Sequence, residues 1–498
     1  MKPSTLKNKI LWGDWSFFGV GLFFIIHGYC INVEMVPLKP LALLLIGLLI
    51  AAYFIFFISK KVLASDRKAN IFTSLVGIAV LFFGVFQNFI TQFRFLSDYS
   101  RLRFFLPFIL LMLALLFIWL KNTKSSLQKA ILFMNVLLVI YIGLDTGMIL
   151  QSRLFPPERD KWDLAKQHLS TCDSCDKPSV YLVLLDSYFG SKGLKEYFNY
   201  DNSGFENFLT SNGFHVVQAS HSNYIYTIYS MASSLNMQYL GNVGQPDLSN
   251  HYGFITATTA IKENIVCKFF ARQGYQINNF SIFDLPFSPS NCTLPLLTGR
   301  MQLINSQTMY YKVVYAVPFI LEHVGMMKRS REEFFNTFFN NNEHAMEQTL
   351  AASNNSNYPP QFTYLHLLMP HDPLLLDSNG HKTKEADGNW SLPRDSVDNM
   401  FLQYEVYVNK RIASFITQLK KQTADKAVII VMSDHGYRGV KPGSNRILPF
   451  YNLNAIYLPK KNYEGWYNGI SNVNQFKVLF NTLFHQQMTL LPDSIVAR

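Results

Sequence analysis

Asp434 and His435 place a carboxylate and an imidazole side by side, one residue after the apolar run at residues 427–432. A buried strand that ends in such a pair presents two metal ligands at the edge of a sheet. A second apolar run, at residues 180–185, stops in the same way at Asp186. Two carboxylates and one imidazole suit a divalent cation, Zn²⁺ or Mn²⁺ rather than Ca²⁺ or Mg²⁺. A polar turn after a strand is also common without a metal, so this pattern alone does not establish a site.

A hydroxyl group completes the candidate chemistry. Thr227 falls where a helix is expected to start, with Ser230 three residues further on. One interpretation is that Thr227 only caps the helix. The other is that the helix dipole and a bound cation lower the pKa of its hydroxyl enough to make it a nucleophile. Both interpretations remain open from spacing alone.

The elements that must position these groups follow from the hydrophobic pattern. Continuous apolar runs at residues 180–185 and 427–432 are typical of central parallel strands covered on both faces. Residues 362–369 form a third run, and helices are expected at residues 203–211 and 396–422. Strands that alternate with helices indicate an α/β domain with a mostly parallel central sheet. The polar residues that end the three runs should then converge at one edge of that sheet.

The first 154 residues are of a different kind. Five apolar stretches occur there, each near the roughly 20 residues that cross a bilayer as a helix. We therefore expect an all-α bundle of five transmembrane helices at residues 1–154, a juxtamembrane linker at 155–176 and an α/β domain at 177–498. The first stretch is interpreted as an anchor rather than a signal peptide, because further apolar spans follow at once. The five stretches cover residues 15–31, 41–58, 71–93, 104–120 and 130–150.

Basic residues in the connecting loops predict the orientation. Ten Lys and Arg fall at the N-terminus and in the loops after the second and fourth stretches, against four in the opposite loops. The positive-inside rule then places the N-terminus in the cytoplasm and the α/β domain outside. Residues 1–154 carry 15 of the 44 basic residues but only 5 of the 33 acidic ones. The net charge therefore reflects membrane topology and gives no reason to expect nucleic acid as a partner.

Four of the five cysteines, Cys172, Cys175, Cys267 and Cys292, lie in the domain that is expected outside. An even number of cysteines in an oxidising compartment indicates two disulfides, Cys172 to Cys175 and Cys267 to Cys292. The alternative is a four-cysteine zinc site or a redox-active pair. Against that alternative, Cys172 and Cys175 precede the first strand in a linker-like stretch.

Taken in order, Asp186, Thr227, His371 and the Ser-Asp-His-Gly element at residues 433–436 resemble the sulfatase-like branch of the alkaline phosphatase superfamily. A five-helix anchor ahead of an exported catalytic domain is similar to the membrane-anchored phosphoethanolamine transferases and lipoteichoic acid synthases in particular. The resemblance implies an alkaline-phosphatase-like fold for the exported domain.

Carried over position by position, the resemblance implies a role for each residue. Thr227 would be the nucleophile and also a metal ligand. His371, with His366 as a second and weaker candidate, would orient the phosphoryl oxygens or protonate the leaving group. The other metal ligands would be Asp186, Asp434 and His435.

The sequence departs from those families at two positions. Several such transferases have Glu as the first ligand, where this chain has Asp186. They also have a further His shortly after the Ser-Asp-His-Gly element, whereas residues 437–459 contain no His and offer Arg438 among their anion-facing groups. A second metal site is therefore in doubt. The Cys/Ser-x-Pro-x-Arg pattern of true sulfatases is missing from residues 227–233, which argues against cleavage of sulfate esters.

These observations predict a membrane-bound, metal-dependent transferase. It would move a phospho-alcohol head group, of the phosphoethanolamine or phosphoglycerol type, from a phospholipid donor to an envelope glycan or lipid through a phospho-threonine intermediate. The expected location is the bacterial inner membrane, with the catalytic domain in the periplasm. One alternative is a phosphatase or phosphodiesterase on the same scaffold. Alternatives of another class are a non-catalytic envelope-binding module and a lipid-transporting membrane part.

Overall fold

The computed structural model describes residues 11–33, 36–91, 93, 97–154, 169–240, 251–290, 292, 301–314, 329–354, 359–383 and 393–496. The chain divides into two compact units. The first comprises Met1–Arg159 and Pro295–Ser330, and the second comprises Asp160–Leu294 and Arg331–Arg498. Most of the expected linker at 155–176 lies outside the described residues. Residues 295–330, which the sequence places within the α/β domain, group with the helical unit.

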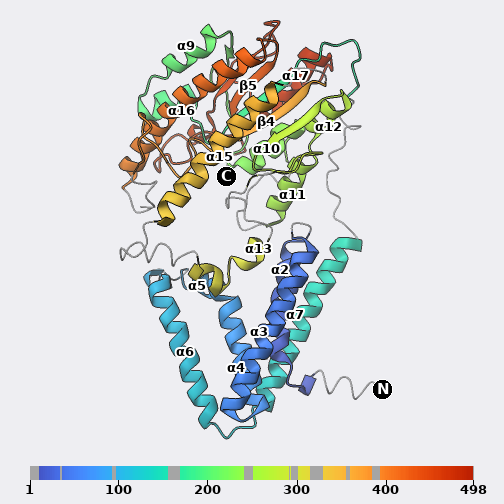
Figure 1. Ribbon diagram of the computed structural model, residues 1–498, viewed down its shortest axis with the longest axis vertical. Coiled ribbons are helices and arrows are strands. Elements are labelled where there is room, and N and C mark those ends of the chain that lie inside the picture. Colours follow the sequence, from blue (N-terminus) through green and yellow to red (C-terminus); the bar gives the residue numbers. More distant parts are fainter. Residues whose placement is uncertain are drawn as a thin grey trace. The chain divides into compact units, whose positions relative to one another are not determined.

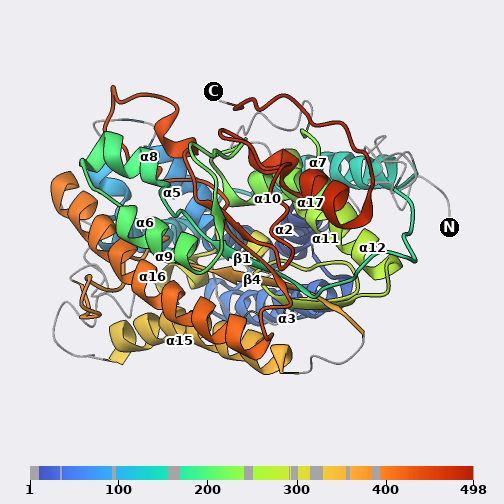
Figure 2. The same ribbon diagram turned by 90° about the horizontal axis from the view of Figure 1, so that it is seen from above.

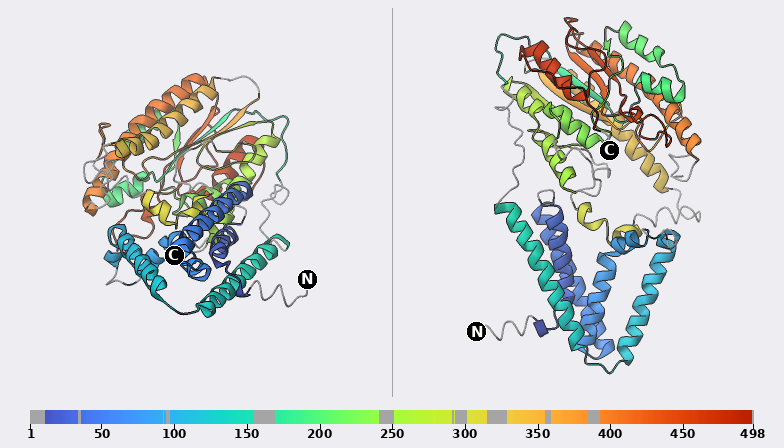
Figure 3. Two further views of the ribbon diagram at one scale, coloured as in Figure 1. Left: turned by 60° about the horizontal axis from the view of Figure 1, so that its bottom comes forward. Right: turned by 180° about the vertical axis from the view of Figure 1, so that it is seen from behind.

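The first unit is helical (Figures 1 and 3). A short turn of 3-10 helix, Ser97–Ser100, separates its first four helices from the next two. The helices are α2 (Ser16–Ile31), α3 (Leu38–Leu63), α4 (Asp66–Leu81), α5 (Phe83–Thr91), α6 (Leu102–Asn122), α7 (Gln128–Leu154) and the short α13 (Gln302–Asn305).

Three of these helices, α3, α6 and α7, are long and apolar enough to cross a membrane. α4 and α5 add a fourth if the 64° bend between them lies within one span. α2 is apolar but short, since its 16 residues extend about 24 Å against a hydrocarbon core of about 30 Å. The described residues thus contain three or four candidate spans, and the prediction of five is confirmed only in part.

The second unit is built on a six-stranded sheet with the order β2-β6-β5-β1-β4-β3. β1 pairs in parallel with β4 and β5, and β3 pairs in parallel with β4. β6 runs antiparallel to β5 and β2, so the sheet is mixed. The predicted parallel arrangement therefore holds for β5, β1, β4 and β3 but not at β6. The strands are β1 (Val180–Leu185), β2 (His215–Val216), β3 (Gln276–Phe280), β4 (Gln361–Leu367), β5 (Val428–Ser433) and β6 (Asn454–Tyr457).

Helices cover both faces of this sheet (Figure 2). On one face lie α9 (Ser203–Ser211), α15 (Arg329–Ser353) and α16 (Arg394–Gln422). On the other lie α10 (Thr227–Asn236), α11 (His251–Lys262), α12 (Ile265–Arg272) and α17 (Gln475–Phe484). The remaining short elements are α8 (Ser191–Gly193), a turn of π-helix at Leu194–Phe198, and 3-10 turns at Leu448–Phe450 and Asn472–Asn474.

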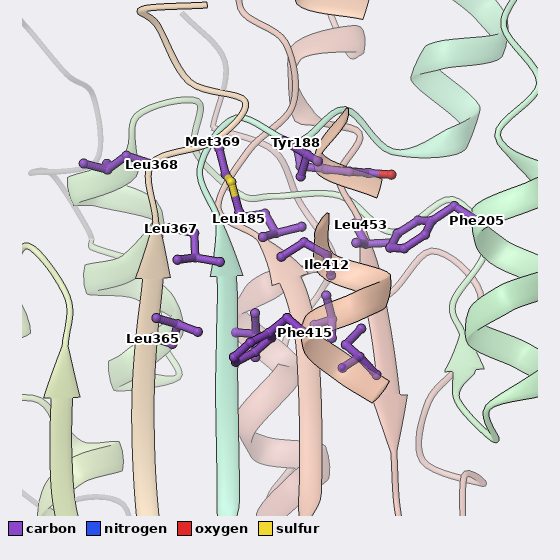
Figure 4. Close-up of a cluster of buried hydrophobic side chains, with 14 of the residues drawn as sticks. Leu185, Tyr188, Phe205, Leu365, Leu367, Leu368, Met369, Ile412, Phe415 and Leu453 are labelled. Atoms are coloured by element: carbon purple, nitrogen blue, oxygen red, sulfur yellow. The ribbon is translucent and has the colours of Figure 1, made fainter. Parts of the chain in front are cut away.

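Because both faces are covered, every residue of β1, β4 and β5 is buried, which explains their continuous apolar runs. Leu185 of β1 faces α16, where it belongs to one apolar cluster with Ile412 and Phe415 (Figure 4). Side chains alternate along a strand, so Leu184 and then Asp186 point to the opposite face, the one that α10 covers. The site develops on that second face.

One ionisable side chain lies inside the core that α16 forms with the sheet. Glu405 is only 1% exposed, and its carboxyl oxygens have no side-chain hydrogen-bond partner. Burial raises the pKa of Glu405 well above its usual 4.5, and the backbone amide of Phe189 offsets only part of this effect. Burial therefore favours the neutral, protonated form of Glu405.

The cysteines differ in part from the prediction. Cys172 and Cys175 form a disulfide. The predicted disulfide between Cys267 and Cys292 is wrong for this structure. Cys267 is a buried thiol near the start of α12, where burial raises its pKa to about 12, and the Cys292 thiol instead donates a hydrogen bond to Asn341 Oδ1 at 3.4 Å.

Candidate metal centre

The ends of two neighbouring strands bring the carboxylates together. Leu185 of β1 is in register with Ser433 of β5, and each strand ends at that residue. Asp186 and Asp434 are the next residues along their chains, so they leave the sheet side by side on the same edge. The convergence follows from the register of two buried parallel strands.

The ligand atoms of Asp186, Asp434 and His435 all lie within 4.8 Å of one another. His435 Nε2 is 3.3 Å from Asp434 Oδ2 and 4.0 Å from Asp186 Oδ1. All three side chains are almost completely buried. Two carboxylates and an imidazole that point at one another out of water require a compensating positive charge.

The hydrogen bonds around the cluster show which of its nitrogen and oxygen atoms are free to bind a cation. His435 Nδ1 lies 2.8 Å from the carbonyl oxygen of Gly436, so the Nδ1 proton is donated there and the Nε2 lone pair faces the carboxylates. Asp434 Oδ1 accepts the backbone amide of Ser187 at 3.0 Å. Asp434 Oδ2 is buried and accepts no hydrogen bond within the described residues. A buried, unpaired carboxylate oxygen beside an imidazole lone pair fits a divalent cation held by both.

Thr227 completes the group. Its Oγ1 lies 3.5 Å from Asp186 Oδ2 and 3.4 Å from His435 Nε2. Thr227 is the first residue of α10, and the N-cap is Tyr226, which makes no side-chain capping bond. The Thr227 hydroxyl therefore points at the candidate ligands instead of capping the helix. Ser230, one turn later, donates to the backbone oxygen of Asp434 at 2.6 Å and ties α10 to the end of β5.

His366 lies beside Asp186 inside the core. Its Cα is paired with that of Leu184 in the sheet, so its side chain lies on the same face as Asp186. His366 Nε2 is 3.2 Å from Asp186 Oδ2, and the ring is almost fully buried next to Tyr364. The imidazole of His366 thus contacts the Asp186 carboxylate from inside the core, and substrate binding by His366 stays a prediction. The alternation of side chains along β4 could have revealed this position.

His371 lies in the turn after β4, beside Arg438. Arg438 Nη2 donates to His371 Nε2 at 3.1 Å, and His371 Nδ1 donates to the backbone oxygen of Asp372 at 2.6 Å. The guanidinium carbon of Arg438 also lies 5.4 Å from the centre of the Tyr226 ring, next to Thr227. No carboxylate of the described residues forms an ion pair with Arg438. Arg438 thus brings a positive charge to the candidate site, where it contributes to lowering the pKa of His435.

The pKa values of Asp186 and His435 are both lowered in this site, for different physical reasons. Burial alone raises the pKa of Asp186, but His371, His366 and His435 together outweigh burial and hold that pKa well below its usual range. Burial lowers the pKa of His435 below 6.5, against the opposing effect of Asp434. An ionised carboxylate and a neutral imidazole are the forms that bind a metal.

Sequence inspection missed the residues that support Asp434 from behind. Asn472 Nδ2 donates to the backbone oxygens of Ser433 and Asp434, at 3.1 Å each. Its Oδ1 accepts from Asn452 Nδ2 at 2.8 Å. Asn472 lies 38 residues from Asp434 in a short 3-10 turn. An asparagine in a loop carries no distinctive signal, so no pattern could have identified it.

We expect Asn472→Ala to weaken metal binding by about 10- to 100-fold, because the loop that carries Asp434 and His435 loses its fixed position. Isothermal titration with Zn²⁺ measures the effect. The matched control is Asn481→Ala, which removes a comparable asparagine that bonds to the backbone of Met488. That control should lose stability only. Equal metal affinity in the two variants would contradict the role assigned to Asn472.

The geometry can now be compared with known proteins. The family model described as Sulfatase matches residues 180–478, which is more than half of the chain and spans the sheet and all the site residues above. The chain belongs to the sulfatase family. It is thus a member of the sulfatase-like branch of the alkaline phosphatase superfamily, and a phosphotransferase or hydrolase by class. No curated protein matches the chain.

Several solved structures resemble this sulfatase-family chain distantly. One is the C-terminal periplasmic domain of EcEptC from Escherichia coli in complex with Zn, at 15% identity and a TM-score of 0.38, over 62% of this chain and 83% of that one. Another is the integral membrane protein lipooligosaccharide phosphoethanolamine transferase A from Neisseria meningitidis, at 12% identity and a TM-score of 0.38, over 96% of each chain. A third is the phosphonate monoester hydrolase of Agrobacterium radiobacter, at 12% identity and a TM-score of 0.37, over 62% and 74%. Such distant similarity does not assign a substrate.

Proposed function

We propose that this protein transfers a phospho-alcohol head group from a membrane phospholipid to an envelope glycan or lipid, through a phosphorylated Thr227. One observation carries the proposal: the Thr227 hydroxyl lies within 3.5 Å of both Asp186 and His435. Asp186, Asp434, His435 and Thr227 would hold Zn²⁺ or Mn²⁺. When bound, the cation supplies positive charge that lowers the pKa of the hydroxyl and polarises a phosphoryl oxygen.

The reaction takes place in two substitutions at phosphorus. Thr227 Oγ1 gives up its proton and attacks the phosphorus of the donor, the bond from phosphorus to the oxygen of the leaving lipid alcohol breaks, and that oxygen takes up a proton. An acceptor hydroxyl then attacks the same phosphorus, loses its proton, and displaces Thr227 Oγ1, which takes up a proton and becomes a hydroxyl again. The position of Thr227 at the start of α10 favours both steps, because the partial positive charge of the helix end stabilises the alkoxide.

Arg438 is proposed to bind the phosphoryl oxygens that are not displaced, and His371 is proposed to orient those oxygens through the Arg438 guanidinium. Arg438 has no carboxylate partner among the described residues, so its charge is available for an anion. His371 Nε2 accepts a hydrogen bond from one N–H group of the Arg438 guanidinium. This bond fixes the direction in which the remaining N–H groups point. A planar guanidinium can offer two parallel donors to one phosphate, which a lysine cannot.

Arg438→Gln is expected to lower kcat/KM for a phosphodiester by about 10²-fold, the usual cost of one oxyanion donor. Steady-state kinetics on a chromogenic phosphodiester or a labelled phospholipid measure the change. The control is Arg446→Gln, which removes an exposed arginine from the same loop. Kinetics of Arg438→Gln that match those of the control would exclude Arg438 from substrate binding.

Covalent capture tests the proposed function itself. The purified protein is incubated with labelled membrane phospholipids and divalent metal, and any adduct is located by mass spectrometry, with Thr227→Ala and Asp434→Ala in parallel. A phospho-alcohol group on Thr227 that requires Asp434 is expected. Steady phosphate release in the absence of an acceptor would instead identify a phosphatase or phosphodiesterase on the same scaffold. Metal binding with neither adduct nor turnover would identify a binding protein.

The proposed orientation places the N-terminus in the cytoplasm and the catalytic domain in the periplasm. It is supported by the ten-to-four distribution of basic residues over the loops between the apolar helices. A disulfide between Cys172 and Cys175 agrees with an oxidising compartment. Labelling of the two termini with membrane-impermeant reagents in spheroplasts tests this placement.

A further inference from the structure

A short stretch of the chain, residues 301–314, belongs to the helical unit, although the chain before Pro295 and after Ser330 belongs to the catalytic unit. The unit boundaries fall at Arg159, at Leu294 and at Ser330, so the two units are joined by three chain crossings. The stretch contains α13, which lies beside the ends of α2 and α5 (Figure 1). We call residues 301–314 the returning segment.

The returning segment buries an apolar side chain among the apolar helices. Ile304 is only 3% exposed and belongs to one cluster with Phe24 and Tyr29 of α2. Gly28 of α2 makes this approach possible, because a Cβ atom there would come within 3.0 Å of Ile304 Cγ2. Ile304 is thus packed as closely as a residue of the helical core.

A second contact lies at the bend between α4 and α5. The backbone amide of Gly84 donates to the backbone oxygen of Gln307 at 2.7 Å. A Cβ atom on Gly84 would lie 3.0 Å from Gln307 Cα and 2.8 Å from Lys312 Cε. A larger residue at position 84 would therefore push the returning segment away from the bend.

We propose that the returning segment is a second membrane anchor, which keeps the catalytic unit attached to the helical unit independently of the linker after α7. A segment that only connected two parts of the catalytic unit would have no need to bury Ile304 or to bond to Gly84. Tyr310 lies in the same segment and is 74% exposed. An exposed tyrosine in a segment that packs against membrane helices suits the head-group layer of a bilayer. The anchor is a property of the fold and does not depend on the reaction.

Cutting the linker in the full-length protein tests this anchor. A specific protease site is inserted between Arg159 and Asp160, the membranes are treated with the protease and washed in high salt, and the catalytic fragment is followed by sedimentation. The wild-type fragment is expected to stay with the membranes. Gly84→Leu and Ile304→Asp should each release it into the supernatant. Gly143→Leu on α7 is the matched control, since a Cβ atom at Gly143 meets nothing within 4 Å.

Two results would overturn the proposal: release of the wild-type fragment, or retention of the fragment in both the Gly84→Leu and the Ile304→Asp variants. Copurification of the two fragments in mild detergent provides a readout that does not depend on membrane partition. After the cut, an affinity tag on the N-terminal fragment should retain the wild-type catalytic fragment. A catalytic fragment that elutes separately would also contradict the anchor. Melting of the released fragments shows whether the catalytic unit is still folded.

Discussion

Thr227→Val is expected to abolish turnover, with a fall in kcat of at least about 10⁴-fold, while the protein stays folded. Valine has nearly the shape of threonine and the same β-branch, so the start of α10 is preserved and only the hydroxyl is lost. That hydroxyl lies 3.4 Å from His435 Nε2 and 3.5 Å from Asp186 Oδ2. Turnover of a labelled phospholipid, together with intact-mass analysis, measures the effect.

Two further variants sharpen this test. Thr227→Ser keeps a hydroxyl and should retain part of the activity and all of the covalent adduct. Thr210→Val changes an exposed threonine whose hydroxyl bonds only to its own helix, and should behave as wild type. If Thr227→Val still turned over substrate at near the wild-type rate, the phosphothreonine route would be wrong and direct attack by water would replace it.

Glu405→Gln should stabilise the protein, and the gain should grow with pH. The folded-state pKa of Glu405 is raised, so its contribution to stability is fully present below about pH 4.5 and is lost as pH rises toward the folded-state value. Glutamine does not titrate. The difference between variant and wild type should therefore increase as the pH rises above about 4.5, toward the folded-state pKa of Glu405.

Denaturant unfolding of the full-length protein between pH 5 and pH 8 measures this trend. Glu347→Gln provides the control, because the side chain of Glu347 lies at the surface, 74% exposed. A constant difference between Glu405→Gln and wild type would mean that Glu405 is ionised in the folded protein, with a compensating partner.

The position of the candidate centre could be predicted from the sequence because it follows from a simple rule. Apolar runs that end in Asp186 and in Asp434 and His435 become neighbouring buried strands, and register then brings their ends together. The role of Thr227 needed the family resemblance, since its spacing alone allowed an N-cap. In the structure the Thr227 hydroxyl points at the cluster, and its role as a nucleophile stays a prediction.

Other features depend on contacts that no local pattern encodes. The Cys267 to Cys292 disulfide was predicted only because the exported domain has an even number of cysteines. In the structure Cys267 is a free thiol buried on α12. His366 lies within a strand, so its environment is set by the face on which it projects and not by its proximity to His371. Asn472 supports the centre from a loop. The count of spans depends on the length of α2 and on the bend between α4 and α5, which hydropathy does not describe.

The pairing of β1 with β5 joins two segments that are synthesised at different times, and the candidate centre needs both. Ser187, which binds the Asp434 carboxylate, precedes Asp434 by 247 residues. At synthesis rates of about 5–20 residues per second, the second half of the ligand set emerges some 10 to 50 seconds after the first. A chain that is still being synthesised therefore lacks the complete ligand set. A cation held by Asp186, Asp434 and His435 would be taken up in the compartment where the finished domain folds, so the supply of metal there would set the fraction of protein that carries it.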